Sequence, residues 1–177
     1  MFESGATRGS TLLGLARSIY RYSVETKKPN DQRLREYTET ALPAREQAMY
    51  SPAPITPSME IAVLADYFTF LGRELGYEDP VVKQLLDGRT PLAAARHAVE
   101  TTRIIDVEER KRLAQDPASA QSSTDGMIRL ARVLDGPARE LRKRYEDEVE
   151  SVVTRAAAQI AQARFALSGG NAYPDAT

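Results

Sequence analysis

The chain has 177 residues, with 24 basic and 25 acidic side chains and a net charge of −1. It therefore lacks the strong positive field that attracts nucleic acid or an anionic membrane surface. A hydrophobic content of 42% and a charged content of 28% are typical of a folded domain with a sizeable core. Cysteine is absent, which excludes disulfides, thiol catalysis and thiolate metal sites.

The N-terminal residues Met1-Phe-Glu-Ser-Gly-Ala6 lack the basic and apolar regions of a signal peptide. No apolar run approaches the length that a membrane-spanning helix needs. We therefore expect a chain that has no membrane span and no signal peptide of its own.

Helix signals dominate the first part of the chain. Ser10 or Thr11 is predicted to cap a helix that ends at the cluster Lys27-Lys-Pro-Asn30, where proline removes a backbone donor. A short helix is predicted over residues 43–50. The three prolines of residues 51–57 then predict a stiff loop, although a hinge is an alternative.

An amphipathic helix is predicted next, with Ser58 as its cap and Gly76 at its C-terminal end. Its apolar residues recur at steps of three and four, which places them on one face: Ile61, Leu64, Ala65, Phe68 and Leu71.

Four short helices are predicted to begin at acidic or hydroxyl residues. These starts are Asp79-Pro80, Thr90-Pro91, Asp106 and Asp116-Pro117. Glu109 follows Asp106 by three residues and resembles the second member of a capping box. A short apolar stripe covers residues 127–134.

The last predicted helix begins near Pro137 and ends at about Ser168, before Gly169-Gly170. At 1.5 Å per residue it would be roughly 48 Å long, more than the width of a compact domain of this size. Its second half is rich in alanine and is predicted to pack closely on a neighbour. The helix has one continuous apolar face: Leu141, Tyr145, Val149, Val152, Ala156, Ile160, Ala163 and Leu167.

Strand signals are nearly absent, because no alternating run of Val, Ile or Thr reaches five residues. The sequence therefore predicts an all-α fold in which several short helices pack against one long C-terminal helix. The segment Ala172-Tyr-Pro-Asp-Ala-Thr177 is expected to be extended.

The single histidine, His97, lies on a predicted helix without a second histidine or a cysteine as a partner. A zinc site would have to be made mostly of carboxylates, which is unusual. We expect His97 to be packed or solvated, with catalysis as the less favoured alternative.

Four acidic residues, Glu146, Asp147, Glu148 and Glu150, form a dense patch that could in principle bind a cation or transfer protons. Basic residues precede them, and Arg142–Glu146 and Lys143–Asp147 are spaced i,i+4. We therefore predict a solvated helix face. No catalytic, cofactor-binding or metal-binding residue is assigned, and no cofactor is expected.

Two segments resemble a known family. They are Ser123-Thr-Asp-Gly-Met-Ile-Arg-Leu-Ala-Arg-Val-Leu-Asp-Gly-Pro-Ala-Arg139 with Leu141-Arg-Lys-Arg-Tyr-Glu-Asp-Glu-Val149, and Ile160-Ala-Gln-Ala-Arg-Phe-Ala166 leading to Tyr173-Pro-Asp-Ala-Thr177. They closely resemble the bacterial dipeptidyl-peptidases seven and eleven, of serine-peptidase family forty-six. Residues 28–33, 42–45 and 79–83 fit more loosely.

The resemblance implies a parent enzyme with a chymotrypsin-like double β-barrel, a His-Asp-Ser triad and an inserted helical domain that covers the cleft. Such enzymes remove dipeptides from peptide N-termini. The triad positions lie upstream and downstream of this region, and His97 does not match the triad histidine. We therefore expect the chain alone to be an inactive fragment.

The resemblance also implies a domain organisation, partners and a location. Residues 1–170 would form the cleft-capping helical domain, and residues 171–177 would lead toward a β-barrel that the chain lacks. The partners would be peptide substrates and the rest of the peptidase chain, with a homodimer of the parent possible, in the periplasm or cell envelope.

Two further readings of the sequence stay open. The chain could be a free-standing helical module that binds or regulates another protein through its alanine-rich face. It could also be an independent helical enzyme that depends on His97, which is the least favoured of the three.

Overall fold

The computed structural model describes residues 9–168 and divides the chain into two compact units, residues 1–138 and 139–177. All regular structure in the described residues is helical, which confirms the all-α prediction. None of the described helices is long and apolar enough to cross a membrane. Gly169, Gly170 and residues 171–177, for which a helix end and an extended segment are predicted, lie outside the described residues.

The first unit begins with α2 (Thr11–Glu25), two short 3-10 turns at Asn30–Gln32 and Arg35–Tyr37, and α3 (Leu42–Met49). The helices α4 (Pro57–Glu74), α5 (Pro80–Leu86) and α6 (Pro91–Glu100) follow. The unit continues with α7 (Val107–Gln115), α8 (Pro117–Ser122) and the first part of α9 (Gly126–Tyr145).

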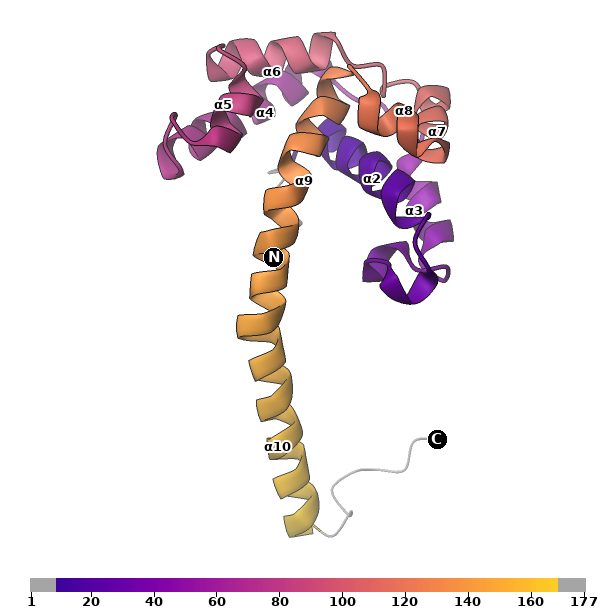
Figure 1. Ribbon diagram of the computed structural model, residues 1–177, viewed down its shortest axis with the longest axis vertical. Helices are drawn as coiled ribbons and strands as arrows, with labels where there is room; N and C mark the ends of the chain where they lie inside the picture. The colour runs from indigo at the N-terminus through magenta and orange to yellow at the C-terminus, as the bar shows by residue number, and fades with distance from the viewer. Residues whose placement is uncertain (1–8, 169–177) are drawn as a thin grey trace. The chain divides into compact units, whose positions relative to one another are not determined.

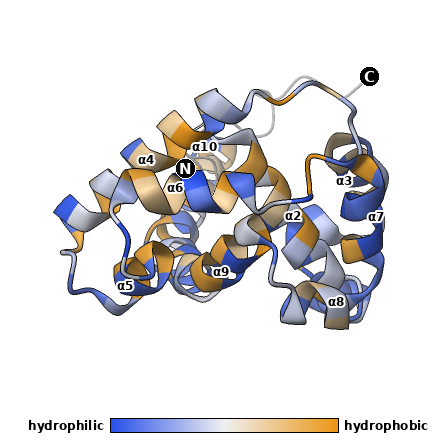
Figure 2. Ribbon diagram, turned by 90° about the horizontal axis from the view of Figure 1, so that it is seen from above, coloured by the Kyte–Doolittle hydropathy of each residue, from blue (hydrophilic) through white to orange (hydrophobic). Residues whose placement is uncertain are grey.

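Two groups of helices form the first unit. Helices α4, α5 and α6 pack on one another, while α2 packs on α3, α7 and α8 (Figure 1). Apolar and polar residues alternate around the helices, as expected for amphipathic segments (Figure 2). A single apolar core joins the groups, and its largest buried side chains include Leu12, Leu13, Ile19, Leu64, Phe68, Leu85, Leu113 and Met127.

Most of the predicted helix starts are confirmed by their capping bonds. The side chains of Ser10, Asp79, Thr90, Asp106 and Asp116 each accept a bond from a backbone N–H in the following turn. Gly76 has φ +90° directly after the end of α4, as a C-terminal glycine requires.

Two predictions about caps are wrong. Helix α4 begins two residues earlier than predicted, with Thr56 rather than Ser58 at the cap position and no side-chain capping bond. Glu109 does not complete a capping box, because the Asp106 N–H donates to the Arg103 carbonyl and Glu109 instead pairs with Arg112.

The predicted start of the last helix is also wrong. Helix α9 begins at Gly126, and Pro137 lies in its interior. The apolar stripe of residues 127–134 is therefore the first part of this helix and is buried in the core. Gly136 precedes Pro137 and has no Cβ for the proline ring to contact, which lowers the cost of this proline.

The second unit continues the helix. The end of α9, a π-helical turn η3 (Glu146–Glu150) and α10 (Ser151–Ser168) follow one another without a break. The predicted end at Ser168 is confirmed. Every residue from 152 to 167 is exposed, so α10 buries none of its apolar face.

Two buried charged side chains fix the first unit through backbone groups. The carboxylate of Glu60, on α4, accepts bonds from the Ser10 hydroxyl (2.7 Å) and from the N–H groups of Thr11 and Leu12 (both 3.1 Å). It therefore caps α2 from another helix, where the positive end of the helix dipole favours a carboxylate.

The guanidinium of Arg110, on α7, is only 2% exposed and donates to four carbonyl oxygens. Two of them, Met49 and Ser51, lie at the end of α3, and Ile104 and Ile105 lie in the loop before α7. Burial lowers the pKa of this guanidinium. One side chain thus joins the end of α3 to the loop before α7 and to α7 itself.

Replacing Arg110 by methionine should destabilise the first unit strongly, because four carbonyl groups lose their donor while the apolar stem is kept. We expect the free energy of unfolding to fall by about 3 kcal/mol. Urea denaturation followed by circular dichroism measures the change. The exposed Arg112→Met serves as the control and should cost less than about 1 kcal/mol, since its ion pair with Glu109 is at the surface. Equal losses in the two variants would contradict this role for Arg110.

Candidate functional site

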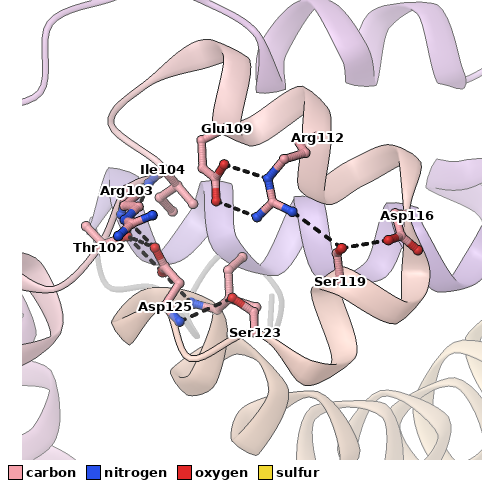
Figure 3. A network of polar contacts seen from close by, with 10 residues as sticks. Thr102, Arg103, Ile104, Glu109, Arg112, Asp116, Ser119, Ser123 and Asp125 are labelled. Atoms are coloured by element: carbon pink, nitrogen blue, oxygen red, sulfur yellow. Dashed lines mark hydrogen bonds and ion pairs between the residues drawn. The ribbon is translucent and has the colours of Figure 1, made fainter.

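The first unit has a polar hollow of about 480 Å³. It lies between α7, α8 and the loops that precede α7 and α9 (Figure 3). Hydroxyl and charged side chains dominate its lining, which consists of Thr101, Arg103, Glu109, Arg112, Ser119, Ser122, Ser123, Thr124 and Asp125.

Asp125 forms the floor of the hollow. Its carboxylate accepts bonds from the Thr102 hydroxyl (2.9 and 3.0 Å) and the Arg103 N–H (2.6 Å) in the loop before α7. It also accepts from the N–H groups of Met127 (2.9 Å) and Ile128 (3.1 Å) in the first turn of α9. The carboxylate therefore caps α9 and fixes the neighbouring loop at the same time.

Gly126 permits the close approach that this arrangement needs. A Cβ atom at this position would lie 2.4 Å from the Thr101 hydroxyl oxygen and 2.6 Å from the Ala98 carbonyl oxygen. Both distances are far below van der Waals contact. The start of α9 therefore lies against the end of α6 in a way that only glycine allows.

One ion pair and one hydrogen bond involve residues that line the hollow. Glu109 and Arg112 are joined by two bonds of 2.7 Å, and Ser119 donates to Asp116 at 2.6 Å. The bond from Arg112 lowers the pKa of Glu109, and the bond from Ser119 lowers that of Asp116. Both carboxylates are therefore ionised at neutral pH, and neither is tuned to act as a general acid.

The serine hydroxyls of the hollow are engaged in structural bonds. Ser119 donates to Asp116, Ser122 donates to the Ala118 carbonyl, and Ser123 accepts from the Asp125 N–H. A serine nucleophile needs a neighbouring base such as histidine. His97 is not one of the lining residues. This geometry is that of a junction between helices rather than a reaction centre.

The structure places His97 on the exposed side of α6, with its carbonyl accepting bonds from the N–H (3.1 Å) and hydroxyl (2.6 Å) of Thr101. Within residues 9–168, no group of three or more His, Asp or Glu side chains is arranged to hold a metal ion.

The predicted solvated face in the second unit is confirmed. Arg142–Glu146 (2.7 Å), Lys143–Asp147 (2.6 Å) and Arg144–Glu148 (3.0 Å) are i,i+4 ion pairs. Asp147, Glu148 and Glu150 are exposed and Glu146 is half-buried. The four carboxylates do not converge on a site.

A second candidate surface is the apolar side of α10. Large apolar side chains remain exposed on it, among them Val152, Val153, Ile160, Phe165 and Leu167. Val152, Ala156, Ile160, Ala163 and Leu167 form one stripe because they recur at steps of three and four residues. Small and large residues alternate along this stripe, which suits close packing against another surface.

Comparison with known proteins identifies the family. The model of the peptidase S46 family matches residues 1–177, the whole chain. The chain therefore belongs to the peptidase S46 family, which confirms the resemblance seen in the sequence. No curated protein matches the chain.

The structural roles of Asp125, Gly126, Glu60 and Arg110 were not predicted from the sequence. Asp125 was detectable, since an aspartate directly before the apolar stripe of residues 127–134 is a typical helix cap. The partners of Glu60 and Arg110 are mostly remote in sequence, so no local signal pointed to them.

Replacing Asp125 by alanine should cost about 3 kcal/mol of unfolding free energy, because it removes a buried, charged acceptor of bonds from two segments. Asp116→Ala is the matched control, since Asp116 is also a helix cap but is exposed, and should cost about 1 kcal/mol. Thermal denaturation compares the two variants. If Asp125→Ala were as mild as its control, the junction would not depend on this carboxylate.

Proposed function

We propose that this chain is the helical part of a serine dipeptidyl-peptidase, and that residues 1–170 cap the catalytic cleft of that enzyme. Membership of the peptidase S46 family over the whole chain supports the proposal. In the enzymes that the sequence resembles, the catalytic triad belongs to a β-barrel, whereas the described residues here are helical.

The exposed face of α10 is the single observation that best supports a capping role. In proteins, most of the stability of a helix comes from the packing of its apolar face. Burying one large aliphatic side chain contributes about 1.5–3 kcal/mol. The stripe from Val152 to Leu167 would therefore contribute several kcal/mol if it lay against the catalytic part of the enzyme.

The substrates would be peptides with a free N-terminus, from which dipeptides are removed. The helical part would restrict access to the cleft, so that chain ends enter and internal segments do not. The location would be the periplasm or the cell envelope, and a homodimer of the whole enzyme is an expectation of the resemblance. The catalytic residues would be supplied by the barrel and not by this chain.

The first test measures turnover of dipeptidyl fluorogenic substrates by the chain alone. We expect no release of fluorophore, because Ser119 and Ser122 in the hollow donate structural bonds and His97 is not among its lining residues. A matched preparation of a complete family enzyme is the positive control. Sustained turnover by the purified chain, lost on replacement of His97, would favour an independent helical enzyme instead.

The second test places arginines on the α10 stripe of the complete enzyme. Val152→Arg with Ile160→Arg should lower dipeptide release at least about tenfold, because two charges would be buried at the interface with the barrel. Thr154→Arg with Ala161→Arg is the matched control. Thr154 lies two residues from both Val152 and Ala156, about 200° around the helix, so this pair faces away.

Cleavage of N-terminally blocked peptides should be recorded in the same variants. If the helical part no longer covers the cleft, blocked peptides can enter it. Cleavage of these peptides should therefore rise in the Val152→Arg, Ile160→Arg variant only. Identical behaviour of the two double variants would contradict the capping role.

A further inference from the structure

The polar hollow between α7, α8 and the start of α9 is large enough to hold a small molecule. Its volume of about 480 Å³ lies within the range of ligand pockets, roughly 300–1,000 Å³. Its lining comes from separate segments, with Arg103 in the loop before α7, Arg112 on α7 and Ser123 after α8 (Figure 3). The chemistry of the hollow depends on which polar groups of this lining remain free to bind a ligand.

The carboxylates that line the hollow are already engaged as acceptors. Asp125 accepts from four donors, one hydroxyl and three backbone N–H groups. Glu109 accepts two bonds of 2.7 Å from a guanidinium of α7. The carbonyl groups of Gln121 and Ser123, at the end of α8, both accept from Arg132. These acceptors are therefore occupied by the protein itself.

Donor groups of the lining, by contrast, remain open. The guanidinium of Arg103 forms no hydrogen bond or ion pair with any residue between 9 and 168, and only the backbone N–H of this residue is bound. The Ser123 hydroxyl accepts from the Asp125 N–H and still has its own proton to donate. The exposed hydroxyl of Thr124 has no partner among the described residues either. One cation and two hydroxyl groups are thus available to an acceptor.

The charges of the lining favour the same class of ligand. Glu109 and Arg112 neutralise one another, and Asp125 is only 9% exposed. The pKa of Glu109 is lowered first by its bond from Arg112 and also by the charge of Arg103, so the Arg103 guanidinium lies near this pair. Among the lining residues, Arg103 therefore supplies the positive charge that has no carboxylate bound to it.

We propose that the hollow binds a small molecule through an oxyanion, a carboxylate or phosphate group, that pairs with the Arg103 guanidinium and accepts from the hydroxyl groups of Ser123 and Thr124. Arginine presents its N–H donors in a planar fork that matches two oxygens of either group. The rest of the ligand is polar, because hydroxyl and charged side chains dominate the lining. The site shares no residue with the α10 stripe and does not depend on the capping role.

Titration of the isotope-labelled 177-residue chain, followed by nuclear magnetic resonance, tests the site with two probes, inorganic phosphate and dialanine. We expect saturable shifts of the amide signals of Arg103, Ser123 and Thr124 with at least one probe. Saturation by phosphate alone would assign a phosphate compound, and saturation by dialanine alone a carboxylate. Dialanine amide lacks the carboxylate and should bind at least about tenfold more weakly than dialanine. Absence of saturation with both probes, or equal measurable binding of dialanine and its amide, would overturn the proposal.

Variants of the donors locate the binding. Arg103→Gln should weaken binding of the probe at least about tenfold, because it removes a charged donor. Arg96→Gln is the matched control, since Arg96 is exposed on α6 and does not line the hollow, and it should leave binding unchanged. Thr124→Val keeps the shape of the side chain and should weaken binding by about threefold through the loss of one hydroxyl.

These variants should fold normally, because the replaced side chains form no bonds with the described residues. Circular dichroism and thermal denaturation check this. Arg103→Glu places a negative charge at the same position and should abolish measurable binding. Equal binding by Arg103→Gln and Arg96→Gln, or binding that survives in Arg103→Glu, would show that the hollow is not the site.

Discussion

The packing of an apolar helix face is the constraint on which this structure depends, and the two units meet it differently. In the first unit, the apolar stripe of α9 that begins at Met127 is buried in the same core as apolar residues of α2 and α4, and this burial helps to stabilise a helix that contains Pro137. In the second unit, residues 152–167 of α10 are all exposed. Intrinsic propensity alone does not stabilise such a helix well. A chain with this face is expected to use it on another surface, which we propose is the catalytic part of a peptidase S46 enzyme.

The polar residues buried in the first unit have a different structural role from the apolar core. Glu60 binds backbone groups at the start of α2, and Arg110 and Asp125 each bind backbone groups of two segments. Arg21 on α2 pairs with Asp135 on α9 at 2.6 Å. A buried charge is costly unless its bonds are satisfied. These four contacts therefore favour one arrangement of the short helices over others of similar apolar burial, and the polar hollow around Asp125 is a consequence of that arrangement.

Local signals in the sequence predicted most of the helices, because helix caps such as Asp79 and Thr90 act within one turn of the chain. The starts of α4 and α9 were predicted wrongly for physical reasons. Thr56 precedes Pro57, so the cap lies two residues before Ser58, which the pattern favoured. Pro137 resembled a helix start. The helix continues through this proline because the residues before it, 127–134, pack in the core. The cap that Glu60 provides for α2 spans 48 residues, and the bond from Arg110 to the Met49 carbonyl spans 61. Contacts at such separations leave no periodic trace in a single sequence.

The most direct measurement of the central claim is amide hydrogen exchange along α10, with and without the catalytic barrel of the complete enzyme. If the stripe from Val152 to Leu167 packs on the barrel, amides of residues 152–167 should exchange rapidly in the chain alone and become strongly protected in the complete enzyme. Amides at the buried start of α9, such as those of Met127 and Ile128, should be protected in both. Unchanged exchange in α10 between the two forms would contradict the proposal that this face covers the catalytic part.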